Sequence, residues 1–116
     1  MNSVWKEVFK ALEKAGFDVY PPATKIGECK APYVVLKDDG TNQTNNFSST
    51  TTYYTLMCYV PLNEYSSLYE YKESVKEAMK TLEPMVMPMH YETASFYDDT
   101  VKAHMISVQY RNHRKL

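Results

Sequence analysis

Three histidines and two cysteines are the side chains in this sequence best suited to catalysis or metal binding. They are His90, His104, His113, Cys29 and Cys58. In one register of the expected C-terminal hairpin, His104 lies diagonal to Glu92, and in the other register it faces Thr93. We interpret either arrangement as an ordinary cross-strand pair on the protein surface.

The spacing of these residues matches no metal or catalytic motif. The sequence has no H-E-x-x-H pattern, no C-x-x-C pair and no acidic loop with calcium spacing. With three glycines in all, it also lacks a phosphate-cradling loop. Cys58 falls inside an expected strand, where it suits a small buried position. We therefore predict that the protein is not an enzyme and that it binds no cofactor or metal.

Composition indicates a single globular domain spanning residues 1–116. Hydrophobic residues make up 44% of the chain and charged residues 23%, with a formal net charge of -1. The basic block is confined to residues 111–115, which argues against a nucleic-acid-binding surface. We expect no membrane span and no signal peptide, because no apolar run is long enough. The absence of a disulfide framework favours a reducing compartment.

The chain is organised around residues 49–62, which predict a long central strand. Eleven tyrosines in the chain are an unusual load, and several fall in this stretch. Alternation places one set of side chains on one face: Tyr54, Leu56, Cys58 and Val60. It places another set on the opposite face: Tyr53, Thr55, Met57 and Tyr59. Both sets are largely apolar, so we assign the first to the helices and expect a partner for the second.

Two amphipathic helices are expected to cover this strand. The first is capped by Ser3, runs to about residue 15 and ends at Gly16. Its apolar stripe consists of Trp5, Val8, Phe9, Leu12 and Ala15. The second runs over residues 68–82, and a Ser67-x-x-Glu70 capping box opens it. Lys72 and Lys76 belong to its solvated face.

Further strands are expected at residues 32–37, 89–97 and 101–111, and a short extra strand can precede Pro21. Residues 41–50 are almost wholly Asn, Gln, Ser and Thr, which suits an elongated hairpin tip or a mobile arm. The predicted fold is α+β: a mainly antiparallel sheet covered on one face by two helices. The predicted order is α-β-β-α-β-β, with a long polar hairpin arm.

The sequence of elements carries a family resemblance. The shared features are a first helix ending in Gly16-Phe17, a strand at residues 31–36, an Asn/Thr-rich insert, a tyrosine-rich strand at 53–60, a break at Pro61, a charged second helix, and a closing hairpin at 91–111 with Asp98-Asp99 at its turn. This layout resembles the tail terminators of phages and prophages, which are also described as minor capsid or tail-completion proteins. The resemblance covers nearly the whole chain as a pattern of elements.

The resemblance implies a structural role in virion assembly. Such a protein forms a ring, usually a hexamer, that caps the tail tube at its head-proximal end. Its partners are other copies of itself, the tail tube protein and a head completion or connector protein, while DNA passes through without specific binding. The implied location is the virion tail, and the bacterial host cytoplasm during assembly.

Candidate contact residues follow from the polar arm, the second face of the central strand and the last hairpin. They are Asn42, Asn45, Phe47, Tyr53, Met57, Tyr59 and Tyr97. For Tyr59→Glu we expect a folded monomer that fails to assemble. Candidate channel-lining residues are Asp38, Asp39, Asp98 and Asp99, because acidic walls keep DNA from sticking. Solvated turn residues are the plain alternative for these four.

Two other functions are compatible with the same sequence. A head–tail connector or adaptor subunit shares the size and the α+β build. From a different class, the chain could be a monomeric cytoplasmic binding module or small enzyme that uses a pocket between sheet and helices. The mass of the protein in solution discriminates between these readings.

Overall fold

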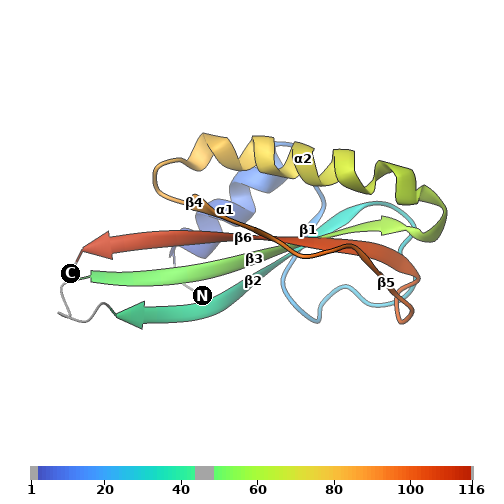
Figure 1. Ribbon diagram of the computed structural model, residues 1–116, viewed down its shortest axis with the longest axis horizontal. Helices are drawn as coiled ribbons and strands as arrows, with labels where there is room; N and C mark the ends of the chain where they lie inside the picture. The colour runs from blue at the N-terminus through green and yellow to red at the C-terminus, as the bar shows by residue number, and fades with distance from the viewer. Residues whose placement is uncertain (1–2, 44–48, 116) are drawn as a thin grey trace.

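A computed structural model describes residues 3–43 and 49–115 and confirms the predicted α+β class (Figure 1). The helices are α1 (Ser3–Lys14) and α2 (Leu68–Met79), and the 3-10 helices η1 (Leu62–Ser67) and η2 (Lys80–Leu82) flank α2. The strands are β1 (Val19–Tyr20), β2 (Tyr33–Gln43), β3 (Ser49–Pro61), β4 (Met87–Glu92), β5 (Phe96–Asp98) and β6 (Ala103–Lys115).

The described strands form one mixed sheet of six strands, in the order β1-β2-β3-β6-β4, with β5 also paired to β6. β1 and β2 are parallel, whereas β3 pairs with β2 and β6 in antiparallel fashion. The observed order differs from α-β-β-α-β-β in two places. The short strand before Pro21 is present as β1, and the region expected as one strand at residues 89–97 forms two strands.

A bulge explains why β4 and β5 are separate strands. Pro88 pairs with Tyr110 and Glu92 pairs with Val108, so the β4 side spans more residues than the β6 side. His90, inside the bulge, has a φ of 57°. Pairing resumes at β5, where Tyr97 lies opposite His104. His104 therefore faces neither Glu92 nor Thr93, and both expected registers of this hairpin were wrong.

α1 forms and ends close to where its sequence predicts. Its apolar stripe is buried at Val4, Trp5, Val8 and Leu12, while Ala15, expected in the stripe, is exposed. Gly16 adopts a φ of 98°, and the Phe17 N–H donates to the Leu12 carbonyl at 3.1 Å. Glycine tolerates this left-handed conformation, so it closes the helix at little steric cost.

α2 begins at the predicted residue without the predicted capping box. Ser67 has helical backbone angles, and its hydroxyl donates to the Glu64 carbonyl at 2.8 Å instead of capping α2. The reason is that η1 runs directly into α2, so Ser67 already lies inside a helical turn. Lys72 was assigned to the solvated face of α2, but the structure buries it, with 5% of its surface exposed.

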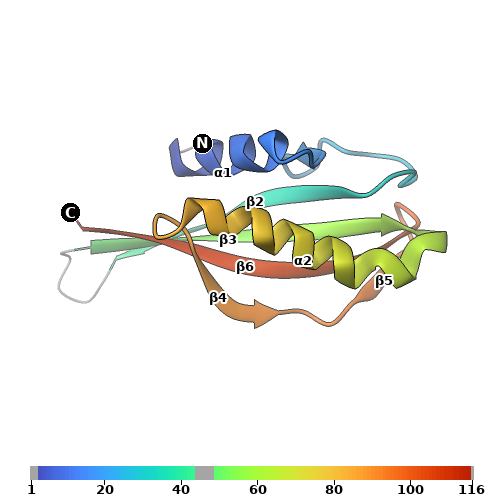
Figure 2. The same cartoon turned by 90° about the horizontal axis from the view of Figure 1, so that it is seen from above.

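Both helices pack on one face of the sheet, as the sequence predicts. Figure 2 shows α1 lying next to β2 and α2 crossing over β3 and β6. The strand residues assigned to this face are fully buried: Tyr54, Leu56, Cys58 and Val60. Tyr54, Leu56 and Cys58 share the main core with Val8 and Leu12 of α1 and Val75 of α2. The Trp5 indole also donates a hydrogen bond to the Leu36 carbonyl at 3.2 Å, which ties α1 to β2.

We call the opposite face of the sheet the outer face. On β3 it carries the side chains of Tyr53, Thr55, Met57 and Tyr59. The chain between β1 and β2 passes below the sheet on this side (Figure 1). Residues of this connection and of the strands form a second, smaller cluster: Cys29, Tyr33, Val35 and Ala103, with Tyr20, Met57, Tyr59 and Val101 packed against them. Part of the outer face is thus covered by the protein itself, which the sequence had not predicted.

β2 and β3 form a longer ladder than expected. β2 continues through Asp38 and Asp39, where a turn was predicted, because a bulge between Asp38 and Gly40 accommodates one extra residue. The φ of Gly40 is 106°, and its N–H donates to the Asp38 carboxylate at 2.8 Å. Pairing then reaches Gln43 and Thr50, so the outer parts of the predicted arm belong to the sheet. The molecule is elongated, measuring 48 × 25 × 24 Å.

Candidate interaction surfaces

The outer face is open toward the C-terminal end of β6, where no described segment lies below the sheet (Figure 1). Tyr53 is half-buried there, between Gly40 of β2 and Arg111 of β6. A shallow concavity of about 380 Å³ adjoins it, lined by Thr51, Tyr53, Pro84, Met87, Arg111 and His113. An aromatic ring beside an arginine is a common composition for protein contact surfaces. Of the predicted contact residues, Tyr53 thus lies half-buried beside an arginine on the open part of the outer face.

Two of the proposed contact residues pack within the chain instead. Tyr59 stacks on Tyr33 with ring centroids 4.8 Å apart, and Met57 belongs to the same cluster. Burial raises the pKa of the Tyr59 hydroxyl. We had expected a neighbouring subunit to cover both side chains. The connection between β1 and β2 supplies much of that cover, because its Cys29 N–H binds the Val101 carbonyl at 2.7 Å and holds it against the sheet.

The remaining contact candidates lie at opposite ends of the molecule. Asn42 is exposed and pairs with Thr51 near the end of the β2–β3 ladder. Tyr97 lies on β5, beside His104. Asn45 and Phe47 fall outside the described residues. The structure therefore does not gather the proposed contact residues into one patch.

The four proposed channel-lining aspartates form two separate pairs. Asp38 lies opposite Tyr54, whereas Asp98 lies next to Ala103, which faces Pro61. These positions are seven residues apart along β3, on the order of 23 Å. Asp39 binds Lys37 at 3.6 Å and accepts a hydrogen bond from Thr55. One copy of the chain therefore presents no continuous acidic wall.

A group of exposed tyrosines lies at the end of the molecule that carries β5 and η1: the predicted contact residue Tyr97, with Tyr65 and Tyr69, which sequence reasoning missed. Tyr65 and Tyr69 expose 55% and 65% of their surface, and Tyr97 exposes 39%. The His104 ring lies between Tyr65 and Tyr97, with centroids 4.7 and 5.3 Å away. Its Nε2 is 3.2 Å from the Leu62 carbonyl. The i, i+4 spacing of Tyr65 and Tyr69 is the sequence signal that could have found this group.

A charged cluster joins α2 to β4. Glu92 accepts hydrogen bonds from Lys72 Nζ at 2.6 Å and from Lys76 Nζ at 2.5 Å. Glu73 lies within 3.6 Å of both ammonium groups. Hydrogen bonds from the two lysines lower the pKa of Glu92, and their bonds to Glu92 raise the pKa of both lysines. Each charge is neutralised by a neighbour, so the cluster fits a structural role.

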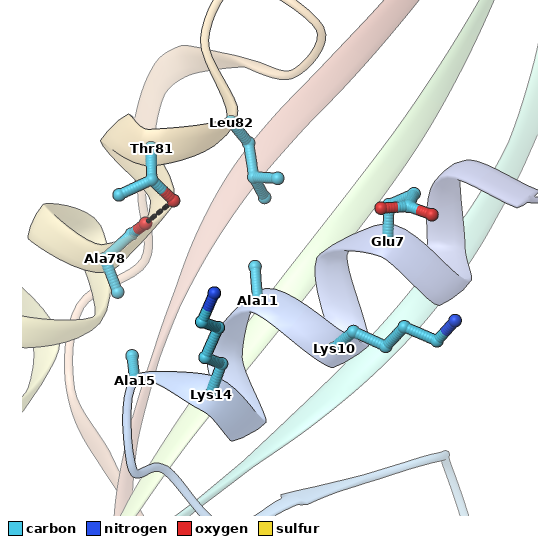
Figure 3. Close-up of a pocket in the computed structure, with 8 residues that line it drawn as sticks. All are labelled: Glu7, Lys10, Ala11, Lys14, Ala15, Ala78, Thr81 and Leu82. Atoms are coloured by element: carbon cyan, nitrogen blue, oxygen red, sulfur yellow. Dashed lines mark hydrogen bonds between the residues drawn. The ribbon is translucent and has the colours of Figure 1, made fainter.

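The helical side carries a shallow groove between α1 and α2 (Figure 3). Its volume is about 470 Å³, and its apolar surface comes from Ala11, Ala15, Ala78 and Leu82. Glu7, Lys10 and Lys14 line it on the α1 side. In Figure 3 the Thr81 hydroxyl donates its proton to the Ala78 carbonyl at 2.8 Å, so it can offer a ligand only an acceptor. The groove offers small apolar side chains and few convergent polar groups.

Both long edges of the sheet are interrupted. β1 pairs with β2 at Val34 and Val35, and beyond them β2 carries the Asp39 bulge. At the other edge, β4 carries Pro88, which has no N–H, and the His90 bulge. Bulges, charges and proline at sheet edges disfavour strand addition. Contacts with other proteins are therefore better served by sheet faces and by the ends of the molecule than by continuous edge pairing.

The titratable groups offer little reactive chemistry. Burial raises the pKa of Cys29, and it raises the pKa of Cys58 to about 12. Both thiols therefore stay protonated near neutral pH. Among residues 3–43 and 49–115, no group of three or more His, Cys, Asp or Glu side chains is placed to hold a metal ion. What the surface offers is aromatic and charged contact area.

Comparison with known proteins adds no assignment: no family model matches the chain, and no curated protein matches it significantly. Within the described part of the chain, no helix is both long enough and apolar enough to span a bilayer.

Proposed function

We propose that this protein is a structural subunit of a phage tail, a tail terminator that forms a homo-oligomeric ring, of six copies in the usual case. The ring caps the tail tube at its head-proximal end and joins it to a head completion or connector protein. DNA passes through its lumen without specific binding. The protein acts in the bacterial host cytoplasm during assembly and then in the virion tail.

One observation carries this proposal. Toward the C-terminal end of β6, no described segment covers the outer face of the long β2–β3–β6 ladder, and this part of the face presents Tyr53 and Arg111. Water can cover the open face of an antiparallel sheet, but the Tyr53 ring gains from burial against another protein. Interfaces are enriched in tyrosine and arginine, so this surface suits another protein. The interrupted edges favour contact through the face.

We also propose contacts for the polar arm and for the hairpin that carries β5. Asn42, with Asn45 and Phe47 of the same segment, is proposed to contact the tube or a neighbouring subunit. Tyr97 belongs to a second contact at the other end. The channel-lining role of Asp38, Asp39, Asp98 and Asp99 needs several copies, because one copy keeps the two pairs apart.

The test measures assembly and tube capping with the full chain. Sedimentation velocity and native mass spectrometry give the oligomer mass. The chain is then added to polymerising tail tube protein from the same source, and tube lengths and ends are measured by electron microscopy. We expect a closed oligomer at one end of each tube and arrested growth. Tyr53→Glu should abolish capping, whereas Lys6→Glu, on the exposed face of α1, should not.

Two results would overturn the proposal. A protein that stays monomeric and never binds tubes is a binding module or small enzyme rather than an assembly subunit. A protein that assembles and binds the head completion protein, yet leaves tube growth unchanged, is a connector or adaptor.

A further inference from the structure

The two ends of the long axis carry opposite charge. Residues 41–43, 49–52 and 111–115 form the end where β6 finishes, and their charged residues are Arg111, Arg114 and Lys115, with no carboxylate. The turn after β5 and η1 lie at the other end (Figure 1). Within residues 62–67 and 98–102 at that end, the charged side chains are Glu64, Asp98, Asp99 and Lys102, and Glu28 lines a hollow with Lys102.

We call the first end the basic end, and its two arginines form no ion pair with the described residues. Arg111 and Arg114 are exposed, and neither forms an ion pair with any residue in the described ranges. The strand fixes the backbone of each arginine, so the ordering cost on binding is confined to the side chain, and the planar guanidinium loses less entropy per hydrogen bond than a lysine ammonium does. The guanidinium groups of these two arginines can therefore donate hydrogen bonds to a partner.

The second end, which we call the tyrosine end, combines aromatic faces with these carboxylates. Tyr65, Tyr69 and Tyr97 are among the exposed large side chains of the molecule. Two of them are held in place, since both contact His104 and the Tyr65 hydroxyl lies 3.2 Å from the Ser95 hydroxyl. Tyr69 already has one cation near its ring, Lys72 Nζ at 4.1 Å from the centroid. Tyrosine faces beside carboxylates are a receptor for guanidinium groups.

One copy cannot join its own two ends, because they lie at opposite ends of a 48 Å axis. A second copy can. We propose that the basic end of one copy, through Arg111 and Arg114, binds the tyrosine end of the next copy, through Tyr65, Tyr69 and Asp99. This contact joins two different surfaces, so repetition gives a ring if the rotation closes and a filament if it does not. The inference rests on the proposed function only in taking self-assembly as the role of these surfaces.

The test uses two variants of the full chain and a matched control. Arg111→Glu/Arg114→Glu disables the basic end, and Tyr69→Ala/Asp99→Lys disables the tyrosine end. Lys6→Glu/Lys10→Glu makes the same charge change as the basic-end variant, but on the exposed face of α1. Circular dichroism first shows that each variant is folded, and sedimentation velocity then gives the dissociation constant of self-association. We expect either end variant to raise this constant by about tenfold or more, and the control to change it less than about twofold.

Mixing the two end variants gives the sharpest result. Each retains one working end, so an equimolar mixture should form 1:1 dimers that do not grow further. The inference is overturned if the mixture stays monomeric, if it forms full-size oligomers, or if an end variant assembles as the wild type does. It is also overturned if the wild type remains monomeric at the highest soluble concentration.

The outcome separates this inference from the proposed function. If the chain assembles through these ends but never caps tail tubes, the contact stands and the tail role fails. If it caps tubes as a ring that both end variants still form, the tail role stands and this contact fails.

Discussion

Glu92 of β4 accepts a hydrogen bond from the ammonium group of Lys72 of α2 at 2.6 Å. The Lys72 side chain is 6% exposed, while that of Glu92 is 28% exposed. Lys76 donates to the other carboxylate oxygen at 2.5 Å. The bond attaches α2 to the interrupted strand at the sheet edge. A buried ammonium requires such a partner, because removing it from water without one is costly.

Glu92→Gln should lower the free energy of unfolding by about 2 kcal/mol, because the buried Lys72 keeps its charge and loses its main carboxylate. Urea unfolding followed by the fluorescence of Trp5, the single tryptophan, measures the change. Glu73→Gln is the matched control, since its side chain is 44% exposed, and it should cost less than about 0.5 kcal/mol. Equal losses in the two variants would contradict the assignment.

A second substitution separates the lost ion pair from lost packing. Adding Lys72→Met to Glu92→Gln removes the stranded charge while keeping a side chain of similar length. The double variant should recover most of the lost stability, because apolar replacements of buried pairs are well tolerated. A double variant that is less stable than Glu92→Gln alone would show that the lysine stem or its contact with Tyr69 is what matters.

The same cluster predicts how stability depends on pH. Hydrogen bonds from Lys72 and Lys76 lower the folded-state pKa of Glu92. Its contribution is therefore complete above its unfolded pKa of about 4.3 and is lost as the pH falls through the lower folded value. The two lysines have raised pKa values, so their contribution is complete below about 10.4 and is lost as the pH rises further. Urea unfolding from pH 2.5 to 7 should show a smaller acid loss for Glu92→Gln than for the wild type.

The contacts of Tyr59 change what its substitution should do. Tyr59→Glu places a carboxylate against the Tyr33 ring, so we now expect the free energy of unfolding to fall by about 2 kcal/mol. Tyr53→Glu, on the open part of the outer face, should cost less than about 1 kcal/mol and act on assembly instead. Thermal unfolding and oligomer mass, measured on both variants, separate the two effects. A stable Tyr59→Glu monomer would restore this side chain as a candidate subunit contact.

The two thiols should react at different rates. Burial raises the pKa of Cys58 to about 12 and also raises that of Cys29, so both should react slowly with a disulfide reagent at pH 8. Cys58 lies in the central strand, whereas Cys29 lies in the connection between β1 and β2. Local opening of a connection costs less than opening the core. Mass spectrometry of partly modified protein should find Cys29 labelled first, and labelling of Cys58 first would contradict this ranking.

Local chemistry made several features predictable from sequence. The alternation of Tyr54, Leu56 and Cys58 follows from the two-residue repeat of a strand, and the structure confirms that this face meets the helices. The end of α1 follows from Gly16, because a glycine can take a positive φ without help from distant residues. The α+β class followed in the same way from the periods of these elements.

Tertiary structure decided the rest, because it depends on partners far apart in the chain. The period of α2 placed Lys72 on the solvated side, but Glu92, twenty residues away, made its burial possible. The pairing of His104 with Tyr97 depended on a bulge that no turn signal marks. In the sequence, both faces of β3 are rich in apolar residues. Only packing shows that the polar connection carrying Cys29 covers Tyr59 and leaves Tyr53 open on the outer face. Strand periodicity sets which face a side chain occupies, and only the folded chain sets what lies against that face.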